Sequence, residues 1–165
     1  MNKKIERNYL DIYSITDLKE SEIFDKNYSI QLVKPADFQL NKFFYKKVGK
    51  NHNWVDRLVW TEKKWTEYIN DKKVKTYVLK YKSDLAGYFE LILHQNEVEI
   101  AYLGLLEEYQ NKKLGSLLLS SAIKNSFLEN PTRVWVHTCS LDHKNALNNY
   151  ISRGMKIFKK ETVII

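Results

Sequence analysis

The sequence has little of what marks several large classes of protein. Its single cysteine, Cys139, excludes an internal disulfide and is typical of a reducing compartment. No Cys and His residues have the spacing of a metal site, so we expect no metal. No apolar run approaches the roughly 20 residues that cross a bilayer, and no apolar signal segment follows the basic N-terminus. We therefore expect a cytoplasmic protein with no membrane partner.

Acidic residues are also in deficit. The chain carries 27 Lys and Arg against 20 Asp and Glu, a formal net charge of +7. Such an excess attracts polyanions, either nucleic acid or a phosphorylated cofactor. The lysines are spread along the chain in short pairs, without an arginine-rich block or a nucleic-acid-binding motif. A nucleic-acid partner is therefore the less favoured of the two, although charge alone does not decide.

Proline and glycine are scarce as well, with two and five residues. No linker, repeat or low-complexity segment divides the chain, and we expect one domain over residues 1–165. Hydrophobic periodicity predicts helices at 36–49, after Thr61, at 113–128 and at 142–153, the last starting at Asp142 and ending before Gly154. It predicts strands at 28–34, 74–82, 86–95, 97–105, 132–140 and 155–165. Within the less clear segment 1–27, "YLDIYSI" predicts a further edge strand.

This order of elements predicts an α/β (α+β) fold. A meander of strands followed by a βαβ crossover implies a mixed, mostly antiparallel, twisted sheet of about six to seven strands. About four helices would cover its two faces. The crossover would be the place where a cofactor binds.

Residues 109–123, "YQNKKLGSLLLSSAI", are the most informative stretch. A polar turn runs into a leucine-rich helix, whose first amides are unpaired and carry a partial positive charge. Such a turn can hold a phosphate or pyrophosphate. Gly115 would let the backbone approach the ligand, and Lys112 and Lys113 add charge. The turn is not a Walker A motif, and a plain solvated loop before a core helix remains the alternative.

The wider context resembles a known family. "VEIAYLGLLEEYQNKKLGSLLLSSAI" resembles the acetyl-CoA-binding motif of the GCN5-related N-acetyltransferase (GNAT) family, and "ALNNYISRGM" resembles its second signature. The spacing of the two motifs matches, as does the order of elements over about residues 28–165. The sequence departs from the family pattern at Lys113 and Asn111, where glycines are usual. Lys113 either reaches a phosphate or marks weakened cofactor binding.

The resemblance implies roles for particular residues. The backbone of the 97–105 strand would meet the pantetheine arm, the turn amides would bind the pyrophosphate, and Tyr150 would be the general acid that protonates the CoA thiolate. His143 or Asn145 would stand for a pantetheine-binding asparagine. The cofactor-binding residues so implied are Leu103, Leu105, Gln110, Asn111, Lys112, Lys113, Leu114, Gly115, Ser116, His143 and Asn145.

The reaction also needs a base, because an ammonium group cannot attack a thioester before it loses a proton. Strand alternation places Glu97, Glu99, Ala101 and Leu103 on one face. Glu99 lies where the histone-acetylating branch of the family has its catalytic glutamate. Glu90, or a relay of water molecules, is the alternative.

The acceptor wall is expected in the aromatic-rich segment 43–68, where a plain apolar core is the competing interpretation. Trp54 and Asp56 are its candidate substrate-binding residues, because an acid beside an aromatic ring suits a cationic amine. At strand spacing, Trp135, His137 and Cys139 share a face, which we expect to lie in the core. A nucleophilic Cys139 is disfavoured because no paired base is evident.

The sequence thus predicts a cytoplasmic N-acyltransferase that uses acetyl-CoA, without a metal, by direct transfer in a ternary complex. One alternative is an inactive module of the same fold that binds acyl-CoA or CoA as a regulator. A nucleic-acid-associated basic protein is the other. The acceptor would be a small-molecule or peptide amine, and family members often form homodimers. The sequence does not choose among small amines, amino acids, peptide N-termini and lysine side chains.

Overall fold

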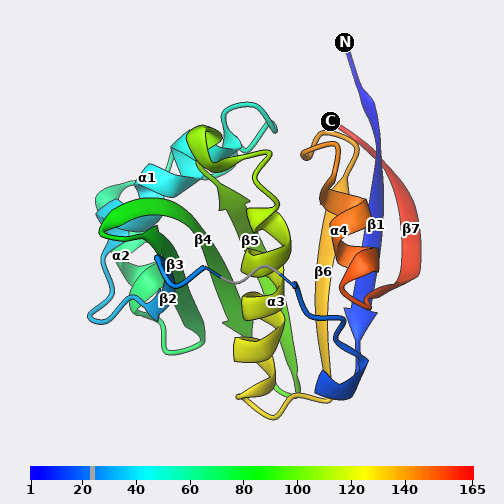
Figure 1. The fold of residues 1–165 in the computed structure, drawn as a ribbon. Helices are drawn as coiled ribbons and strands as arrows, with labels where there is room; N and C mark the ends of the chain where they lie inside the picture. The colour runs from blue at the N-terminus through cyan, green and yellow to red at the C-terminus, as the bar shows by residue number, and fades with distance from the viewer. Residues whose placement is uncertain (23–24) are drawn as a thin grey trace.

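The protein is described by a computed structural model of residues 1–22 and 25–165, in which a seven-stranded sheet carries helices on both faces (Figure 1). The helices are α1 (Phe38–Gly49), α2 (Glu62–Asn70), α3 (Leu114–Phe127) and α4 (Ala146–Ser152). The strands are β1 (Lys4–Ile12), β2 (Tyr28–Leu32), β3 (Val74–Tyr81), β4 (Asp84–Leu93), β5 (Glu97–Leu105), β6 (Arg133–Cys139) and β7 (Lys156–Ile164). Short 3₁₀ turns cover Ile15–Asp17 and Glu107–Tyr109.

The strand order is β2-β3-β4-β5-β6-β1-β7. Strands β2 to β5 form an antiparallel meander, and β5 pairs with β6 in parallel through the α3 crossover. Strand β1 is antiparallel to both of its neighbours, β6 and β7. The predicted mixed, mostly antiparallel sheet with four helices and a βαβ crossover is therefore confirmed.

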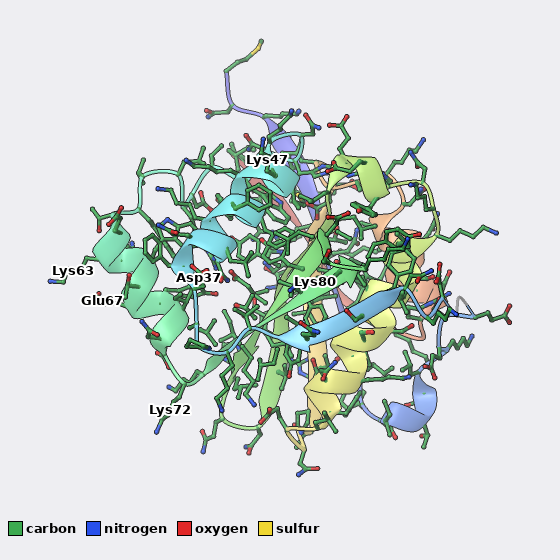
Figure 2. The ribbon with its side chains drawn as sticks, turned by 60° about the vertical axis from the view of Figure 1, so that its left-hand side comes forward. Asp37, Lys47, Lys63, Glu67, Lys72 and Lys80 are labelled. Carbon is green, nitrogen blue, oxygen red and sulfur yellow. The ribbon has the colours of Figure 1, made fainter. Side chains whose placement is uncertain are left out.

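Local sequence explains where the first two helices begin. The carboxylate of Asp37 accepts a hydrogen bond from the amide of Gln39 at the start of α1. Thr61 caps α2 as predicted, because its hydroxyl accepts from the amide of Lys64. Figure 2 shows Asp37 at the beginning of α1, and Lys63 and Glu67 on the outward side of α2. These caps fix the two helices that stand over the meander.

The main core lies between the sheet and α3. The residues of α3 that face the sheet, Leu118, Leu119, Ala122 and Ile123, are fully buried. A smaller core lies under α1 on the opposite face, where the ring of Phe44 stacks on Tyr88 with centroids 4.7 Å apart. Burial of this kind contributes about 1.5–3 kcal/mol for each large apolar side chain. The two cores hold the meander rigidly between helices.

The prediction of an N-terminal edge strand at 9–15 is wrong. Strand β1 is longer and starts earlier, at Lys4, and it lies inside the sheet. Arg7 is paired with Cys139 of β6 on one side and with Glu161 of β7 on the other. The local sequence does not reveal this position, because the partners lie more than 120 residues away along the chain.

The start of the last helix also differs from the prediction, which placed it at Asp142. Helix α4 begins at Ala146. The carboxylate of Asp142 instead accepts hydrogen bonds from the Thr138 hydroxyl at 2.5 Å and the Cys139 amide at 3.0 Å. It therefore fixes the turn that leaves β6. Gly154 follows the helix with a φ of +103°, as a glycine at this position does.

A β-bulge in β5 corrects the predicted alternation of that strand. Tyr102 lies opposite Glu90, but Ile100 lies opposite Leu91, so Ala101 is an extra residue. Ile100 and Leu103 therefore share the core face under α3, whereas Tyr102 packs with the smaller core under α1. Strand alternation on either side of the extra residue places Glu99 on the face of Tyr102, not on that of Leu103.

Candidate active site

Strands β5 and β6 separate soon after they begin, and a cavity of about 1260 Å³ borders the region where they part. Their parallel pairing covers only Glu97–Glu99 with Arg133–Trp135. Beyond this point β5 runs on to Leu105 without a strand partner on the β6 side. A splayed pair of parallel strands leaves backbone hydrogen-bonding groups free for a ligand.

The free backbone groups of β5 include those of Leu103 and Leu105. The amide of Leu106 donates to the carbonyl of Ala86 on the β4 side at 2.8 Å. Alternate residues of a strand bond to opposite neighbours, so Leu103 and Leu105 direct their backbone groups away from β4. Both residues line the cavity. The carbonyl of Leu105 meets the Gln110 side chain at 3.5 Å, a long contact.

The polar turn forms one end of the cavity. Asn111 and Lys113 both have left-handed backbone, with φ of +60° and +63°. These are the two positions where the GNAT motif usually has glycine. The turn therefore keeps the left-handed backbone that glycine favours, although other residues stand there. Lys113 is the N-cap residue of α3, and its carbonyl accepts a hydrogen bond from Ser116 Oγ at 2.8 Å. The first amides of α3 thus face the cavity end.

Gly115 lies where α3 and α4 meet. Its carbonyl accepts from Asn149 Nδ2 at 2.9 Å. A Cβ atom built on Gly115 would have Asn149 Nδ2 as its nearest non-neighbouring atom, at 3.5 Å, an ordinary van der Waals contact. The chain itself therefore leaves room for a side chain at this position, on the wall of the cavity.

Tyr150 of α4 is 7% exposed and lines the cavity. Burial raises the pKa of its hydroxyl well above the usual value, and the charge of Asp142 adds to the rise. The hydroxyl has no hydrogen-bond partner among the residues that the structure describes. Tyr150 is therefore a protonated donor at neutral pH. His143 and Asn145, in the loop before α4, also line the cavity.

The two candidate bases have different environments. Glu99 lines the cavity, with a side chain 15% exposed, and meets His94 Nε2 at 3.1 Å. Glu90 is fully buried and lies outside the cavity lining. Its carboxylate accepts hydrogen bonds from Asn41, Arg57 and Tyr68. Glu90 therefore forms a buried structural ion pair with Arg57, and of the two carboxylates only Glu99 borders the cavity.

Another wall of the cavity comes from the segment between α1 and α2. Trp54 and Asp56 both line the cavity, as predicted for a substrate wall. A Cβ on Gly49 would lie 2.4 Å from the Trp54 Cβ, so the absence of a side chain at the end of α1 lets Trp54 pack there. The Trp54 ring meets Tyr102 edge to face, with centroids 4.9 Å apart.

Arg57, which the sequence did not single out, anchors this segment. Its guanidinium pairs with Glu90 at 3.0 Å, with side chains 6% and 0% exposed. Five aromatic rings surround it within 5.7 Å of their centroids: Tyr45, Trp60, Trp65, Tyr68 and Tyr102. Burial by itself would lower the pKa of Arg57, but the charge of the Glu90 carboxylate opposes burial and holds that pKa above its usual value. The rings add cation–π attraction.

The prediction that Trp135, His137 and Cys139 lie in the core is wrong, although the three do share a face. That face is the one opposite α3, and His137 is exposed. Val134 and Val136, on the other face of β6, are the core residues. His137 and Cys139 line the cavity instead, together with Arg7 of β1. The error arose because one strand pattern fits either face.

Of the predicted site residues, all but one border this cavity. Lys112 does not line it, because its Nζ lies over the Tyr109 ring, 5.6 Å from the centroid. The residues brought together are Trp54, Asp56, Glu99, Leu103, Leu105, Gln110, Asn111, Lys113, Leu114, Gly115, Ser116, His143, Asn145 and Tyr150.

Neither a metal site nor a membrane-spanning helix is found in the part of the chain that the structure describes. Among the described residues, no group of three or more His, Cys, Asp or Glu side chains is arranged to hold a metal ion. Within the same residues, no helix combines the length and hydropathy required to cross a bilayer.

Solved structures with the same fold include several acetyltransferases. A GCN5-related N-acetyltransferase from Sphaerobacter thermophilus matches with a TM-score of 0.74 at 11% identity, over 97% of this chain and 50% of that chain. One from Kribbella flavida matches with 0.70 at 14% identity, over 99% of this chain and 58% of that chain. The present chain thus spans little more than half of these two relatives.

A third structure is closer in length. It is an aminoglycoside acetyltransferase from an uncultured soil metagenomic sample, solved in complex with trehalose, with a TM-score of 0.61 at 18% identity. The match covers 78% of this chain and 88% of that one. No curated protein matches the chain significantly. The family model "Acetyltransferase (GNAT) family", however, matches residues 38–155. This range is most of the sequence and includes β5 and β6, the two strands that separate at the cavity. The chain belongs to the GNAT family of acetyltransferases.

Proposed function

We propose that the protein is an N-acetyltransferase that transfers an acetyl group from acetyl-CoA to a primary amine, by direct attack in a ternary complex. The observation that carries this proposal is the cavity itself. It joins the polar turn before α3, the free backbone of β5 and the buried hydroxyl of Tyr150 in one continuous space. We further propose that residues 1–165 act as one domain, in the cytoplasm.

The cofactor end fits a pyrophosphate group. The amides of the turn and of the first turn of α3 would donate to the phosphates, and Gln110, Asn111, Lys113, Leu114, Gly115 and Ser116 line this end. The left-handed backbone at Lys113 keeps the turn in the shape that glycine gives it elsewhere. This shape supports a binding turn over the alternative of a fold that has lost its cofactor.

Residues of the protein would carry out the other steps of the reaction. Acetyl-CoA, when bound, supplies the acetyl group as a thioester. The backbone amides of Leu103 and Leu105 would orient and polarise the thioester carbonyl. Glu99 would accept the proton that the ammonium group loses, directly or through water. Tyr150 would donate its proton to the departing thiolate, and His143 and Asn145 would hold the pantetheine arm.

Calorimetric titration with acetyl-CoA and with CoA tests the cofactor end. We expect binding in the micromolar range, and a Gly115→Ala variant should bind at least about fivefold more weakly, since one misplaced methyl group in a tightly packed contact costs about 1–3 kcal/mol. The variant has no clash within the chain, so the loss would report on the ligand. Ser121→Ala, on the same helix but outside the cavity lining, is the control.

No binding of either ligand at millimolar concentration would refute the cofactor assignment. With binding established, a screen of primary amines for release of free CoA thiol tests the transfer itself. Binding without turnover of any amine would favour the alternative of a regulatory acyl-CoA-binding module.

A further inference from the structure

Opposite charges face the cavity at its acceptor end. Glu99 of β5 and Arg7 of β1 both line it, on the two sides of the splay. Strand β1 lies next to β6, and Arg7 is paired in register with Cys139, which also lines the cavity. The inserted N-terminal strand thus brings a guanidinium group to the same chamber as the candidate base.

The Arg7 side chain is held in place but not sealed off. Its Nη1 donates to Glu161 Oε1 at 3.3 Å, and the Tyr9 hydroxyl donates to the same oxygen at 2.6 Å. The side chain is 29% exposed. A guanidinium that is fixed by one carboxylate and still borders a cavity is suited to bind a second carboxylate, because it has five N–H donors.

His137 shows that the two charges act on one space. It lies on β6, between the strands that carry Glu99 and Arg7. Although part of the ring is exposed, the surrounding atoms reduce its hydration and lower the pKa of His137. The Arg7 charge lowers it further, and the charges of Glu99, Asp142 and Glu161 oppose both effects. The imidazole is therefore neutral at pH 7 and does not compete with Arg7 for an anionic group.

The aromatic cage nearby does not offer a second cation site. Its rings already enclose the guanidinium of Arg57, which is paired with the buried Glu90. An acceptor with several positive charges would also meet the net charge of +7 on the whole chain. Such a field disfavours polycations and attracts molecules that carry a negative group. Aminoglycosides, the compounds for which the soil enzyme is named, carry several positive charges. We therefore expect this protein to act on an acceptor of a different class.

We propose that the acceptor is a primary amine that also carries a carboxylate, as an amino acid does, with the carboxylate bound by Arg7 and the amine directed toward Glu99. This inference rests on the proposed function, because it names the substrate class of the same site. The rings of Trp54 and Tyr102 also line this end, beside the carboxylate of Asp56, so an apolar or aromatic side chain on the acceptor would have rings to pack against.

The reaction balances with acetyl-CoA as the co-substrate. The ammonium group gives one proton to Glu99 or to water that Glu99 binds. The amine nitrogen forms a bond to the thioester carbonyl carbon and then gives its second proton to solvent, and the carbon–sulfur bond breaks as the carbonyl group re-forms. The thiolate takes its proton from Tyr150, which solvent protonates again. The acceptor carboxylate stays unchanged and serves only to hold the molecule.

Matched pairs of acceptors test this assignment. The pairs are leucine with isopentylamine and phenylalanine with 2-phenylethylamine, which differ only in the carboxylate. We expect at least about a tenfold higher kcat/KM for the amino acid of each pair, as one charge-assisted bidentate contact is worth more than about 1.4 kcal/mol. In Arg7→Gln this preference should fall to within about twofold, through KM rather than kcat.

Two further variants guard against a loss of folding. Arg7→Lys retains the charge and should retain part of the preference. Arg133→Gln is the matched control, because Arg133 of β6 is also paired with acidic residues, Asp11 of β1 and Glu97 of β5, but does not line the cavity. It should keep the full preference. Thermal unfolding of each variant shows that the comparison is made on folded protein.

The outcomes separate the inference from the function on which it rests. Equal turnover of both members of each pair, or a preference that survives Arg7→Gln, would overturn the carboxylate assignment and leave the acetyltransferase intact. If no amine is turned over, calorimetry of the same pairs with CoA-saturated protein still decides. Arg7-dependent binding of the amino acids would support the assignment, and no binding would refute it.

Discussion

The two ends of the cavity differ in the kind of group that lines them: backbone groups predominate at one end and side chains at the other. The proposed cofactor end is made mostly of backbone, supplied by one continuous stretch from the free edge of β5 to the first turn of α3, with His143 and Asn145 before α4 as the added side chains. The acceptor end is made of side chains, which come from β1, β5, β6 and the segment between α1 and α2. Arg7 and Glu99, for example, are 92 residues apart in the sequence and share one chamber.

This difference has consequences for substitution. Amides keep their direction when side chains change, so the cofactor end tolerates Asn111 and Lys113 where the related motif has glycine. The acceptor end depends on the identity of each side chain and on the scaffold that positions it. We therefore expect the same kind of mutation to have a different effect at the two ends.

The largest expected effect is on the reaction at the point where the two ends meet. In Tyr150→Phe, kcat should fall by about 10²–10⁴-fold, because the departing thiolate loses its proton donor. Affinity for acetyl-CoA should change little, since backbone groups carry the binding. The raised pKa of Tyr150 keeps it protonated at pH 10, so its acid role should not be lost below that pH. Steady-state kinetics and calorimetry measure both quantities.

Tyr88→Phe is the matched control for this prediction. Tyr88 is also buried, and its hydroxyl likewise has no hydrogen-bond partner in the described part of the chain, but Tyr88 does not line the cavity. Removing that hydroxyl should leave kcat unchanged and should not destabilise the protein. A Tyr150→Phe variant with the same kcat as Tyr88→Phe would show that Tyr150 only packs.

The second prediction concerns the scaffold of the acceptor end. Arg57→Met removes one partner of a buried ion pair and should lower the free energy of unfolding by about 3–5 kcal/mol, because the Glu90 carboxylate is left without its counter-charge. The double variant Arg57→Met/Glu90→Gln should recover part of this loss. Urea unfolding of both variants provides the measurement.

A small loss in the single variant, under about 1 kcal/mol, would contradict this view of the acceptor wall. It would mean that the segment between α1 and α2 is held mainly by Gly49 and the packing of Trp54. The surface pair of Lys63 and Glu67 on α2 gives the reference value for an exposed ion pair. Lys63→Met should change stability by less than about 0.5 kcal/mol.

The contrast between the two ends also explains what the sequence could predict. The turn, α3, the Thr61 cap and Tyr150 are encoded by residues that are near each other in the chain, and the structure places them as expected. The position of β1 inside the sheet depends on pairing with β6 and β7, which no local pattern specifies. Arg7 was therefore missed as a residue of the cavity.

Two other predictions were wrong for different reasons. The bulge at Ala101 changes the face of Glu99 relative to Leu103, and a bulge depends on the partner strand as much as on its own residues. Asp142 has the sequence of a helix cap, but its carboxylate is taken by Thr138 and the turn after β6. The bulge thus depends on a long-range pairing, whereas at Asp142 one local hydrogen-bonding pattern replaced another that the sequence fits equally well.

The smallest expected effect tests whether a side chain matters at the cofactor end at all. Lys113→Gly should raise the free energy of unfolding by about 1 kcal/mol, because glycine adopts a φ of +63° without the strain that a lysine has there. Lys113→Gln keeps that strain but removes the charge, so it should leave stability unchanged.

If the ammonium group reaches a phosphate, both variants should bind acetyl-CoA a few-fold more weakly, and more so at low salt. If only the amides bind, Lys113→Gln should bind as the original does, and Lys113→Gly should be more stable without loss of affinity. The second result would show that lysine weakens the fold here without serving the ligand. The first would show that the charge compensates for a strained backbone, and that the cofactor end is not made of backbone alone.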